Sequence, residues 1–479
     1  MVFSTSIFIY LFLPITLLIY YIAPKKSKNF IILLSGLVFY SWGEPIYVVV
    51  MLISTMIDYF AGLVMNHFEG KKLPRKICLI VSVVMNLGLL GVFKYSGFIA
   101  ENINAIAGSQ IIDINNMNFF GIDFLPMNML PIGISFFTFQ SMSYTIDLYM
   151  GNVKVQKNPI SFAAFVTLFP QIVAGPIVRY IDVAEQLKKR NESIEHFAQG
   201  VWRFSIGLGK KVILANTIGE LFDTISNSAQ SELSVVASWL GIIAYTFQIY
   251  FDFSGYSDMA IGLGKIFGFT YCENFNYPYI SKSATEFWRR WHMSLGSFFR
   301  DYVYIPLGGN RKRQLLNIFV VWFLTGFWHG ASWNFIIWGL YFGTIIYLEK
   351  KVFFKFTKKL PQVIQWFFAM IVIMVGWAIF YYVDLNSLGT FLKALVGLNN
   401  NPLYSDTLPI TFMSNVTFVV LCIIASTPVP KMLFQKLNDN KVVNGNLDFV
   451  QIIFNVSLIF CIISMLVGES YNPFLYYRF

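Results

Sequence analysis

One histidine stands alone in an aromatic segment of the chain. The segment WFLTGFWHGASWNFIIWG, residues 322–339, contains four tryptophans and a single ionisable side chain, His329. An imidazole with an ordinary pKa of about 6.5 accepts a proton at physiological pH, which suits a general base. A metal site would need further His, Cys or carboxylate ligands close by, and the segment has none. The pattern therefore favours base catalysis over metal binding, with a purely structural histidine as the alternative.

A second cluster of aromatic and charged residues lies upstream, in SATEFWRRWHMSLGSFFRDYVYIPLGGNRKR. Ser283 followed by Glu286 forms an S-x-x-E capping box, which predicts a helix that starts near Ala284. On such a helix Arg289 and His292 share a face, because they are three residues apart. An amphipathic helix at the membrane interface explains the arginines and tryptophans. It does not explain His292, which adds little anchoring at neutral pH.

Two further motifs carry polar groups. YFDFSGYSDMAIG (250–262) gathers two carboxylates, two serine hydroxyls and a tyrosine around Gly255. Ionisable groups inside membrane spans are costly and indicate function by default, so the motif predicts a polar cavity wall or an unwound segment. A structural hydrogen-bond network fits it equally well. PLGGNRKR offers glycines and basic side chains to a phosphate, although its spacing matches neither a P-loop nor a dinucleotide fingerprint.

From these motifs we predict two groups of residues besides the histidines. The candidates for lining a donor path are Trp288, Arg289, Trp291, Trp328, Asp252, Ser254, Tyr256 and Asp258. The candidates for contacting phosphate are Arg311, Lys312 and Arg313. His67 and His196 lie beside basic loops, and we expect both to be solvated surface residues.

The composition requires a membrane protein. Of the 479 residues, 56% are hydrophobic and only 13% are charged, whereas soluble domains carry about 25% charged residues. Apolar runs of the ~20 residues needed to cross a bilayer recur along the chain. The four cysteines are scattered and predict neither a disulfide framework nor a metal pair. The net charge of +10 falls in clusters between apolar runs, as the positive-inside rule expects, and not in a nucleic-acid-binding patch.

The basic clusters orient the chain in the membrane. Three lysines follow the first apolar run (6–23), which we interpret as a retained span, so the N-terminus is expected outside. The loop 282–313 carries seven basic and two acidic residues and should be cytoplasmic. His329 comes sixteen residues after Arg313, roughly 24 Å of helix. This predicts His329 in the outer half of the bilayer and His292 near the cytoplasmic side.

The apolar runs predict an all-α integral membrane protein with eleven or twelve crossings. The stretch 162–180 is interrupted by Pro170 and Pro176 and flanked by basic residues, so it should dip into the membrane and return. Asp58, inside a predicted span, is expected to make an internal hydrogen bond or salt bridge. No repeat or flexible linker divides the chain, which predicts one domain over 1–479 with both termini extracytoplasmic.

Several motifs together resemble a known family. WRRWH, YIPLGG and FWHGASWNFIIWG, in this order and spacing, are similar to the membrane-bound O-acyltransferases, and more closely to their alginate O-acetyltransferase branch. LPIGISFFTFQSMSYTIDLY (130–149), LFPQIVAGPIVR (168–179), FDFSGYSDMAIGLGKIFGF (251–269) and the ending SYNPFLYYRF extend the resemblance over essentially the whole chain, with a motif core at about 130–350.

The resemblance implies a fold and a reaction. The fold is a polytopic ring of tilted helices, with re-entrant and interfacial helices, around a central tunnel. The family's catalytic histidine corresponds to His329 and its second polar position to His292. The donor substrate is an acyl thioester, acetyl-CoA or an acetylated carrier, with no tightly bound cofactor and no metal. His329 deprotonates an acceptor hydroxyl, which attacks the thioester, while His292 positions the thioester or polarises its carbonyl.

The resemblance also implies a cellular setting. The protein lies in a bacterial cell membrane and supplies acetyl groups for an exported glycan of the alginate, peptidoglycan or cellulose type. The acceptor is either a sugar or a serine of an extracytoplasmic partner transferase of the SGNH type. One alternative is the D-alanyl transferase of teichoic acid. Another is a transporter of glycan precursors, although the sequence lacks the paired broken helices in two halves that many transporters have.

Overall fold

The structure is a computed structural model that describes residues 1–113, 118–119, 122–126, 130–227, 234–398, 401–404, 408–439, 441–468, 473 and 475. These residues form two compact units, Met1–Val201 with Ala260–Cys272, and Trp202–Met259 with Glu273–Phe479. The described strands form one antiparallel hairpin, β1 (Asn118–Phe119) and β2 (Ile122–Pro126). The predicted all-α fold is confirmed, whereas the single domain over 1–479 stays a prediction.

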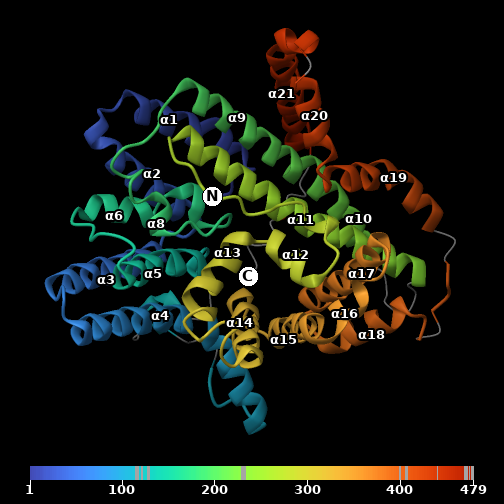
Figure 1. Cartoon of the computed structure of the whole chain (residues 1–479), viewed down its shortest axis with the longest axis horizontal. Coiled ribbons are helices and arrows are strands. Elements are labelled where there is room, and N and C mark those ends of the chain that lie inside the picture. The colour runs from blue at the N-terminus through green and yellow to red at the C-terminus, as the bar shows by residue number, and fades with distance from the viewer. Residues whose placement is uncertain are drawn as a thin grey trace. The chain divides into compact units, whose positions relative to one another are not determined.

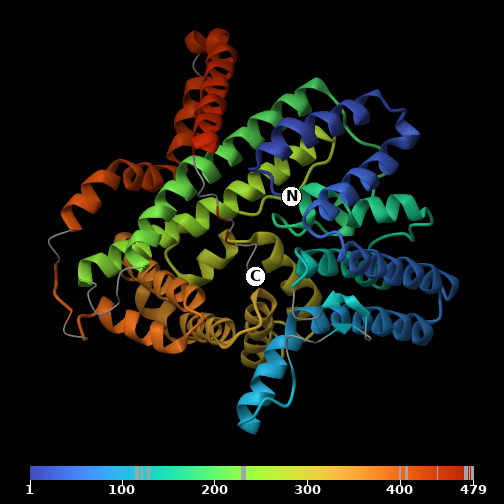
Figure 2. The ribbon, with the colours of Figure 1, turned by 180° about the vertical axis from the view of Figure 1, so that it is seen from behind.

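Besides the hairpin, the described elements of the first unit are helices (Figure 1). They are η1 (Phe8–Phe12), α1 (Leu13–Ile22), η2 (Lys25–Ser27), α2 (Lys28–Gly43), α3 (Val48–His67), α4 (Lys72–Ala107), α5 (Ile134–Met150), α6 (Pro159–Val166), α7 (Phe169–Ile172), α8 (Tyr180–Val183) and the first half of α9 (Ile194–Gly209), whose second half belongs to the second unit. Helices α3, α4 and α5 pack side by side, as Figures 1 and 2 both show. Pro45 lies between α2 and α3 and explains why they do not form one helix, because proline disfavours a continued helix.

A buried carboxylate lies where α3, α4 and α5 meet. Asp58 is fully buried and accepts hydrogen bonds from the hydroxyls of Ser82 and Ser141 and from the amide of Asn86. A buried charge is costly unless its hydrogen-bonding capacity is filled. The internal hydrogen bonding predicted for Asp58 is therefore confirmed.

The predicted interrupted stretch is a series of short helices. Helices α6, α7 and α8 replace one continuous span, because proline removes backbone donors and forces breaks. One carbonyl freed by these breaks, that of Phe165, accepts hydrogen bonds from the side-chain amides of Gln140 (2.9 Å) and Gln171 (2.7 Å). Irregular backbone at membrane depth requires such internal partners.

The second unit carries both histidines of interest. Its elements are η4 (Lys210–Asn216), α10 (Thr217–Ser226), most of α11 (Val235–Ile266), η5 (Pro278–Ile280), α12 (Ala284–Arg290), α13 (Met293–Phe299), η6 (Arg300–Tyr304), α14 (Gln314–His329), α15 (Trp333–Leu348), η7 (Glu349–Phe353), α16 (Phe354–Thr357), α17 (Gln362–Tyr381), α18 (Leu385–Leu395), α19 (Leu408–Ala425), α20 (Val429–Asp439) and α21 (Lys441–Gly468).

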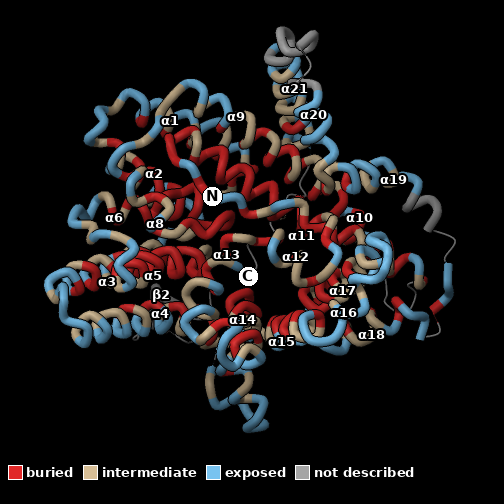
Figure 3. The backbone as a smooth tube through the Cα atoms, in the orientation of Figure 1, coloured by how far each residue is buried: buried red, intermediate tan, exposed pale blue. Residues whose placement is uncertain are grey.

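The protein is a multi-pass membrane protein. Among the described residues, five helices are long and apolar enough to cross a membrane: Val48–His67, Lys72–Ala107, Val235–Ile266, Gln362–Tyr381 and Phe449–Gly468. A pair bent by 67°, Met413–Ala425 with Val429–Lys436, makes a sixth candidate. Fewer helices meet this criterion than the predicted eleven or twelve crossings, because the other apolar runs fold as shorter or interrupted helices. Figure 3 shows α11 buried over most of its length, whereas α21 is largely exposed.

Candidate active site

His329 lies at the sharp turn between α14 and α15. The two helices come close because glycines face each other: a Cβ on Gly326 would lie 2.2 Å from the carbonyl oxygen of Phe335, and one on Gly339 would lie 2.3 Å from that of Trp322. Close helix packing through small residues is common in membranes. His329 itself is the last residue of α14 and is only 3% exposed.

Aromatic rings surround His329. Its imidazole makes edge contacts with Trp328 (ring centroids 5.0 Å apart), Trp338 (5.1 Å) and Phe380 (5.3 Å). Asn334 ties the start of α15 to the end of α17, because its side-chain amide donates to the carbonyls of Phe380 (3.0 Å) and Ile379 (3.3 Å). Aromatic rings therefore bury the imidazole of His329.

The short helix α12 presents the aromatic part of WRRWH. As predicted, it starts at Ala284, and the Ser283 hydroxyl accepts from the Glu286 amide at 3.0 Å. Glu349, which follows α15, adds a second cap. Its carboxylate accepts from the backbone amides of Ala284 (2.7 Å) and Thr285 (2.8 Å). The N-terminal amides of a helix have no partners within the helix, so this carboxylate fixes α12 to the end of α15.

The prediction that Arg289 and His292 share a helix face is wrong. Helix α12 ends at Arg290, Trp291 is extended, and His292 adopts a left-handed conformation (φ 45°) before α13 begins. The reason is tertiary: Asn274 contacts the His292 ring, its Oδ1 lying 3.1 Å from Nδ1, and the Asn274 carbonyl accepts from Met293 N at 2.9 Å. His292 lies in the link between two short helices, outside the membrane-spanning ones, and burial lowers its pKa well below the ordinary value.

One indole separates the two histidines. The ring of Trp328 lies 5.0 Å from that of His329 and 6.0 Å from that of His292. The sequence placed the histidines at different depths, and the fold brings them to one aromatic cluster. Trp288 extends this cluster, because its ring contacts those of Trp322 (5.0 Å) and Trp338 (5.3 Å). Two imidazoles around a dry aromatic core can position and deprotonate a hydroxyl.

The other predicted donor-path residues divide between core and surface. Trp291 is 2% exposed and packs against Phe275 (5.0 Å) and Trp377 (4.7 Å), so it is a core residue. Ser254 and Tyr256 are also buried, on α11. Arg289 is exposed.

Both carboxylates of the FDFSGYSD motif are engaged in ion pairs. Asp252 pairs with Lys211 (2.8 Å), and Asp258 pairs with Arg203 (2.6 Å) and Lys210 (2.7 Å). The predicted unwinding is wrong, because α11 continues through the whole motif. At Gly255 the backbone approaches α9 closely instead: a Cβ there would lie 2.7 Å from the carbonyl oxygen of Gly207.

The buried pair of Lys211 and Asp252 also holds residues near the end of the chain. Lys211 donates to the carbonyl of Pro473, and Asp252 accepts from the amide of Leu475 at 2.8 Å. A carboxylate and an ammonium that are 2% and 3% exposed need such additional hydrogen bonds to offset their desolvation. The ion pair therefore has a structural role.

The predicted phosphate-contacting residues Arg311, Lys312 and Arg313 are exposed at the start of α14. Asn317 organises this loop by donating to the carbonyls of Gly309 (2.9 Å) and Lys312 (2.7 Å). The described residues contain no group of three His, Cys, Asp or Glu side chains that could hold a metal ion.

Sequence reasoning missed Asn274 and Glu349. Neither belongs to a motif with a recognisable spacing, and their partners are 18 and 65 residues away in the chain. Only the tertiary fold brings each to the element that it holds.

The comparisons with known proteins identify the family of this chain. A model of the membrane-bound O-acyltransferase family matches residues 136–384, which include both histidines. A probable alginate O-acetylase of Azotobacter vinelandii is 42% identical over 385 residues, covering 79% of this chain and 75% of the relative. The chain belongs to the membrane-bound O-acyltransferase family. This O-acyltransferase is also 35% identical over 437 residues to a peptidoglycan O-acetyltransferase of Helicobacter pylori, covering 83% and 80% of the two chains.

A more remote member of the O-acyltransferase family matches a smaller part. A teichoic acid D-alanyltransferase of Bacillus subtilis is 32% identical over 235 residues, covering 46% of this chain and 59% of the relative. The similarity to the two O-acetylating relatives therefore extends much further along this acyltransferase.

Proposed function

We propose that this acyltransferase moves an acetyl group from a cytoplasmic thioester, acetyl-CoA or an acetylated carrier, to a hydroxyl on the outer side of a bacterial cell membrane. The product serves O-acetylation of an exported polysaccharide. Two relatives whose names specify alginate and peptidoglycan O-acetylation support this proposal, because each aligns with about four fifths of this chain. The N-terminus is extracytoplasmic in this proposal.

The chemistry is direct acyl transfer. His329 takes the proton of the acceptor hydroxyl as its oxygen attacks the thioester carbonyl carbon. The C–O bond forms, the C–S bond breaks, and the thiolate leaves. The imidazolium of His329 then returns the proton to the sulfur, so the enzyme ends as it began. The aromatic contacts of His329 support this role, because they hold the ring in one orientation and exclude competing water.

The burial of the His329 imidazole by the rings of Trp328, Trp338 and Phe380 is the observation on which the proposal rests most heavily. His329 is 3% exposed, and a solvated structural histidine has no need of such a position. In the proposed setting the acceptor is a sugar or a serine of an extracytoplasmic SGNH-type transferase.

The proposal is tested by measuring base-labile acetate on extracellular glycans in cells that carry His329→Ala or His329→Gln at matched membrane protein levels. The control is His67→Ala, because His67 is exposed at the end of α3. We expect acetate to vanish in the His329 variants and to persist in the control, with polymer export continuing in all. Unchanged acetate in well-folded His329 variants would refute the role of this residue.

The two rival functions give different outcomes in the same cells. Loss of D-alanine esters from teichoic acid, with no change in acetate, would identify a D-alanyl transferase. Loss of polymer export itself would identify a transporter. Labelled acetyl-CoA and a labelled acyl carrier, offered separately to inverted membrane vesicles, then identify the donor.

A further inference from the structure

The side chain of Asn274 has one possible orientation. Its Oδ1 lies 3.3 Å from the backbone nitrogen of Ser294 and accepts a hydrogen bond from it. A backbone amide of this kind can only donate, so the atom that faces it must be the amide oxygen and not the nitrogen. The opposite atom, Nδ2, donates to the hydroxyl of Ser257 on α11 at 3.0 Å.

This orientation determines where His292 carries its proton. The same oxygen lies 3.1 Å from Nδ1 of His292. Two acceptors cannot share a hydrogen bond, and neutral imidazole has one protonated and one unprotonated nitrogen. Since Oδ1 is an acceptor, Nδ1 must hold the hydrogen, and Nε2 must carry the lone pair.

We infer that Asn274 is a positioning residue that fixes His292 in the Nδ1–H tautomer, so that Nε2 acts as a hydrogen-bond acceptor in acyl transfer. The part that concerns acyl transfer rests on the proposed function above. The part that concerns the tautomer rests on geometry alone.

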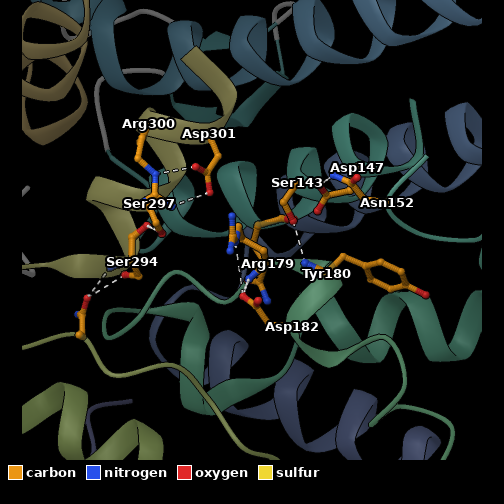
Figure 4. A network of polar contacts seen from close by, with 12 residues as sticks. Ser143, Asp147, Asn152, Arg179, Tyr180, Asp182, Ser294, Ser297, Arg300 and Asp301 are labelled. Atoms are coloured by element: carbon orange, nitrogen blue, oxygen red, sulfur yellow. Dashed lines mark hydrogen bonds and ion pairs between the residues drawn. The ribbon is translucent and has the colours of Figure 1, made fainter. Parts of the chain in front are cut away.

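The surroundings make this arrangement rigid. Asn274 and His292 are 1% and 2% exposed, and the hydroxyl of Ser294 (Figure 4) donates to the same Oδ1 at 2.8 Å. The ring of Phe253 on α11 lies edge-on to the imidazole, with centroids 4.8 Å apart. The left-handed backbone of His292 is a strained conformation for a residue other than glycine, and such strain persists only where the surroundings over-determine it.

The tautomer decides between the two roles that the sequence left open for His292. Polarising a thioester carbonyl requires a donor, and the Nε2 of this tautomer has no hydrogen to donate. Positioning remains: Nε2 accepts a hydrogen bond from an N–H or O–H group of the substrate. Orienting groups of this kind resemble the outer partners of metal-bound histidines, whose loss typically costs about 10- to 100-fold in activity.

The direct test is the ¹⁵N spectrum of the full-length protein, labelled at histidine and reconstituted in lipid bilayers. The chain has four histidines, and the signals of His292 are those missing from His292→Gln. We expect a protonated Nδ1 and an unprotonated Nε2 in the wild type. We expect the same pattern in Asn274→Asp, whose carboxylate keeps the acceptor and allows Ser257 to donate. Asn274→Ala should shift the proton towards Nε2. A wild-type proton on Nε2, or an unchanged pattern in Asn274→Ala, would overturn the inference.

Activity separates positioning from a structural role. Folded Asn274→Ala, with a thermal midpoint measured in parallel, should lose roughly 10- to 100-fold in kcat, whereas Asn274→Asp should retain most of it. Equal losses in both variants, together with an unchanged tautomer, would make Asn274 merely structural. If His329→Ala leaves acetate unchanged, the proposed role of His329 is refuted, whereas the ¹⁵N spectra test the tautomer of His292 independently.

Discussion

Replacing Gly326 with alanine tests whether close helix packing places His329. The added Cβ would lie 2.2 Å from the carbonyl oxygen of Phe335 and 3.2 Å from the Cα of Gly339. Ordinary van der Waals contacts begin near 3.4 Å, so α14 and α15 must separate by about 1 Å. Both obstacles are backbone atoms, which cannot rotate away as a side chain would.

The expected effects follow from that displacement. Overpacking of this kind costs about 1–3 kcal/mol, which lowers the thermal midpoint. His329 lies three residues further along the same helix and must move with it. A misplacement of about 1 Å in a reacting group can reduce a rate by about 100-fold, so we expect activity to fall by far more than the folded fraction does.

The assay combines a thermal-unfolding midpoint with acyl transfer by the purified protein in lipid nanodiscs. Gly389→Ala is the matched control, because Gly389 is in α18 and a Cβ there would meet nothing within 4 Å. Replacing a helix-interior glycine with alanine should stabilise the protein by about 0.5–1 kcal/mol. If Gly326→Ala retains both the stability and the rate of Gly389→Ala, close packing of α14 and α15 does not place His329.

Two further predictions concern charged groups remote from the histidines. Lys211→Met or Asp252→Asn alone should destabilise the protein by about 3–5 kcal/mol, because each leaves a buried charge without its partner. The double variant should lose less stability than the sum of the two single variants. Strictly additive shifts of the thermal midpoint would contradict this coupling. Burial alone would raise the pKa of Glu192. The hydrogen bonds from Lys28 and Tyr20, with the positive charges of Lys28 and Arg190, outweigh this effect and hold the pKa below its ordinary value. Glu192 therefore adds stability that is present above about pH 4.3 and lost as the pH falls through its lowered pKa. Glu192→Gln should lower the thermal midpoint at pH 7 and make the midpoint fall less steeply in acid. Parallel plots of thermal midpoint against pH for the two proteins would rule this out.

The sequence predicted the features that depend on local chemistry. The capping box placed the start of α12 at Ala284, and the prolines placed the breaks in 162–180. The contacts of His329 with Trp328 and Trp338 agree with the tryptophans of its own segment, whereas its role as a base stays a prediction. Each of these depends on residues within a few positions of one another, where turn and helix preferences act directly.

The features that the sequence could not predict depend on distant partners. The carboxylates of Asp252 and Asp258 suggested an unwound helix, but cations on α9 and η4 neutralise them and α11 stays intact. The left-handed turn at His292 depends on Asn274, which has no local signature. Tertiary contacts override local preference at these positions, and local patterns carry no information about them.

Contacts at both ends of α15 fix the length of this helix. At one end the turn that follows His329 is tied to α17 through Asn334, and at the other end Glu349 holds the first amides of α12. Helix α15 itself has 16 residues and is about 24 Å long. Inserting or deleting one residue would rotate Glu349 by about 100° relative to Asn334, and both attachments could not then form. Evolution can therefore lengthen the loops on either side of this hairpin, but the number of residues in α15 is fixed by geometry.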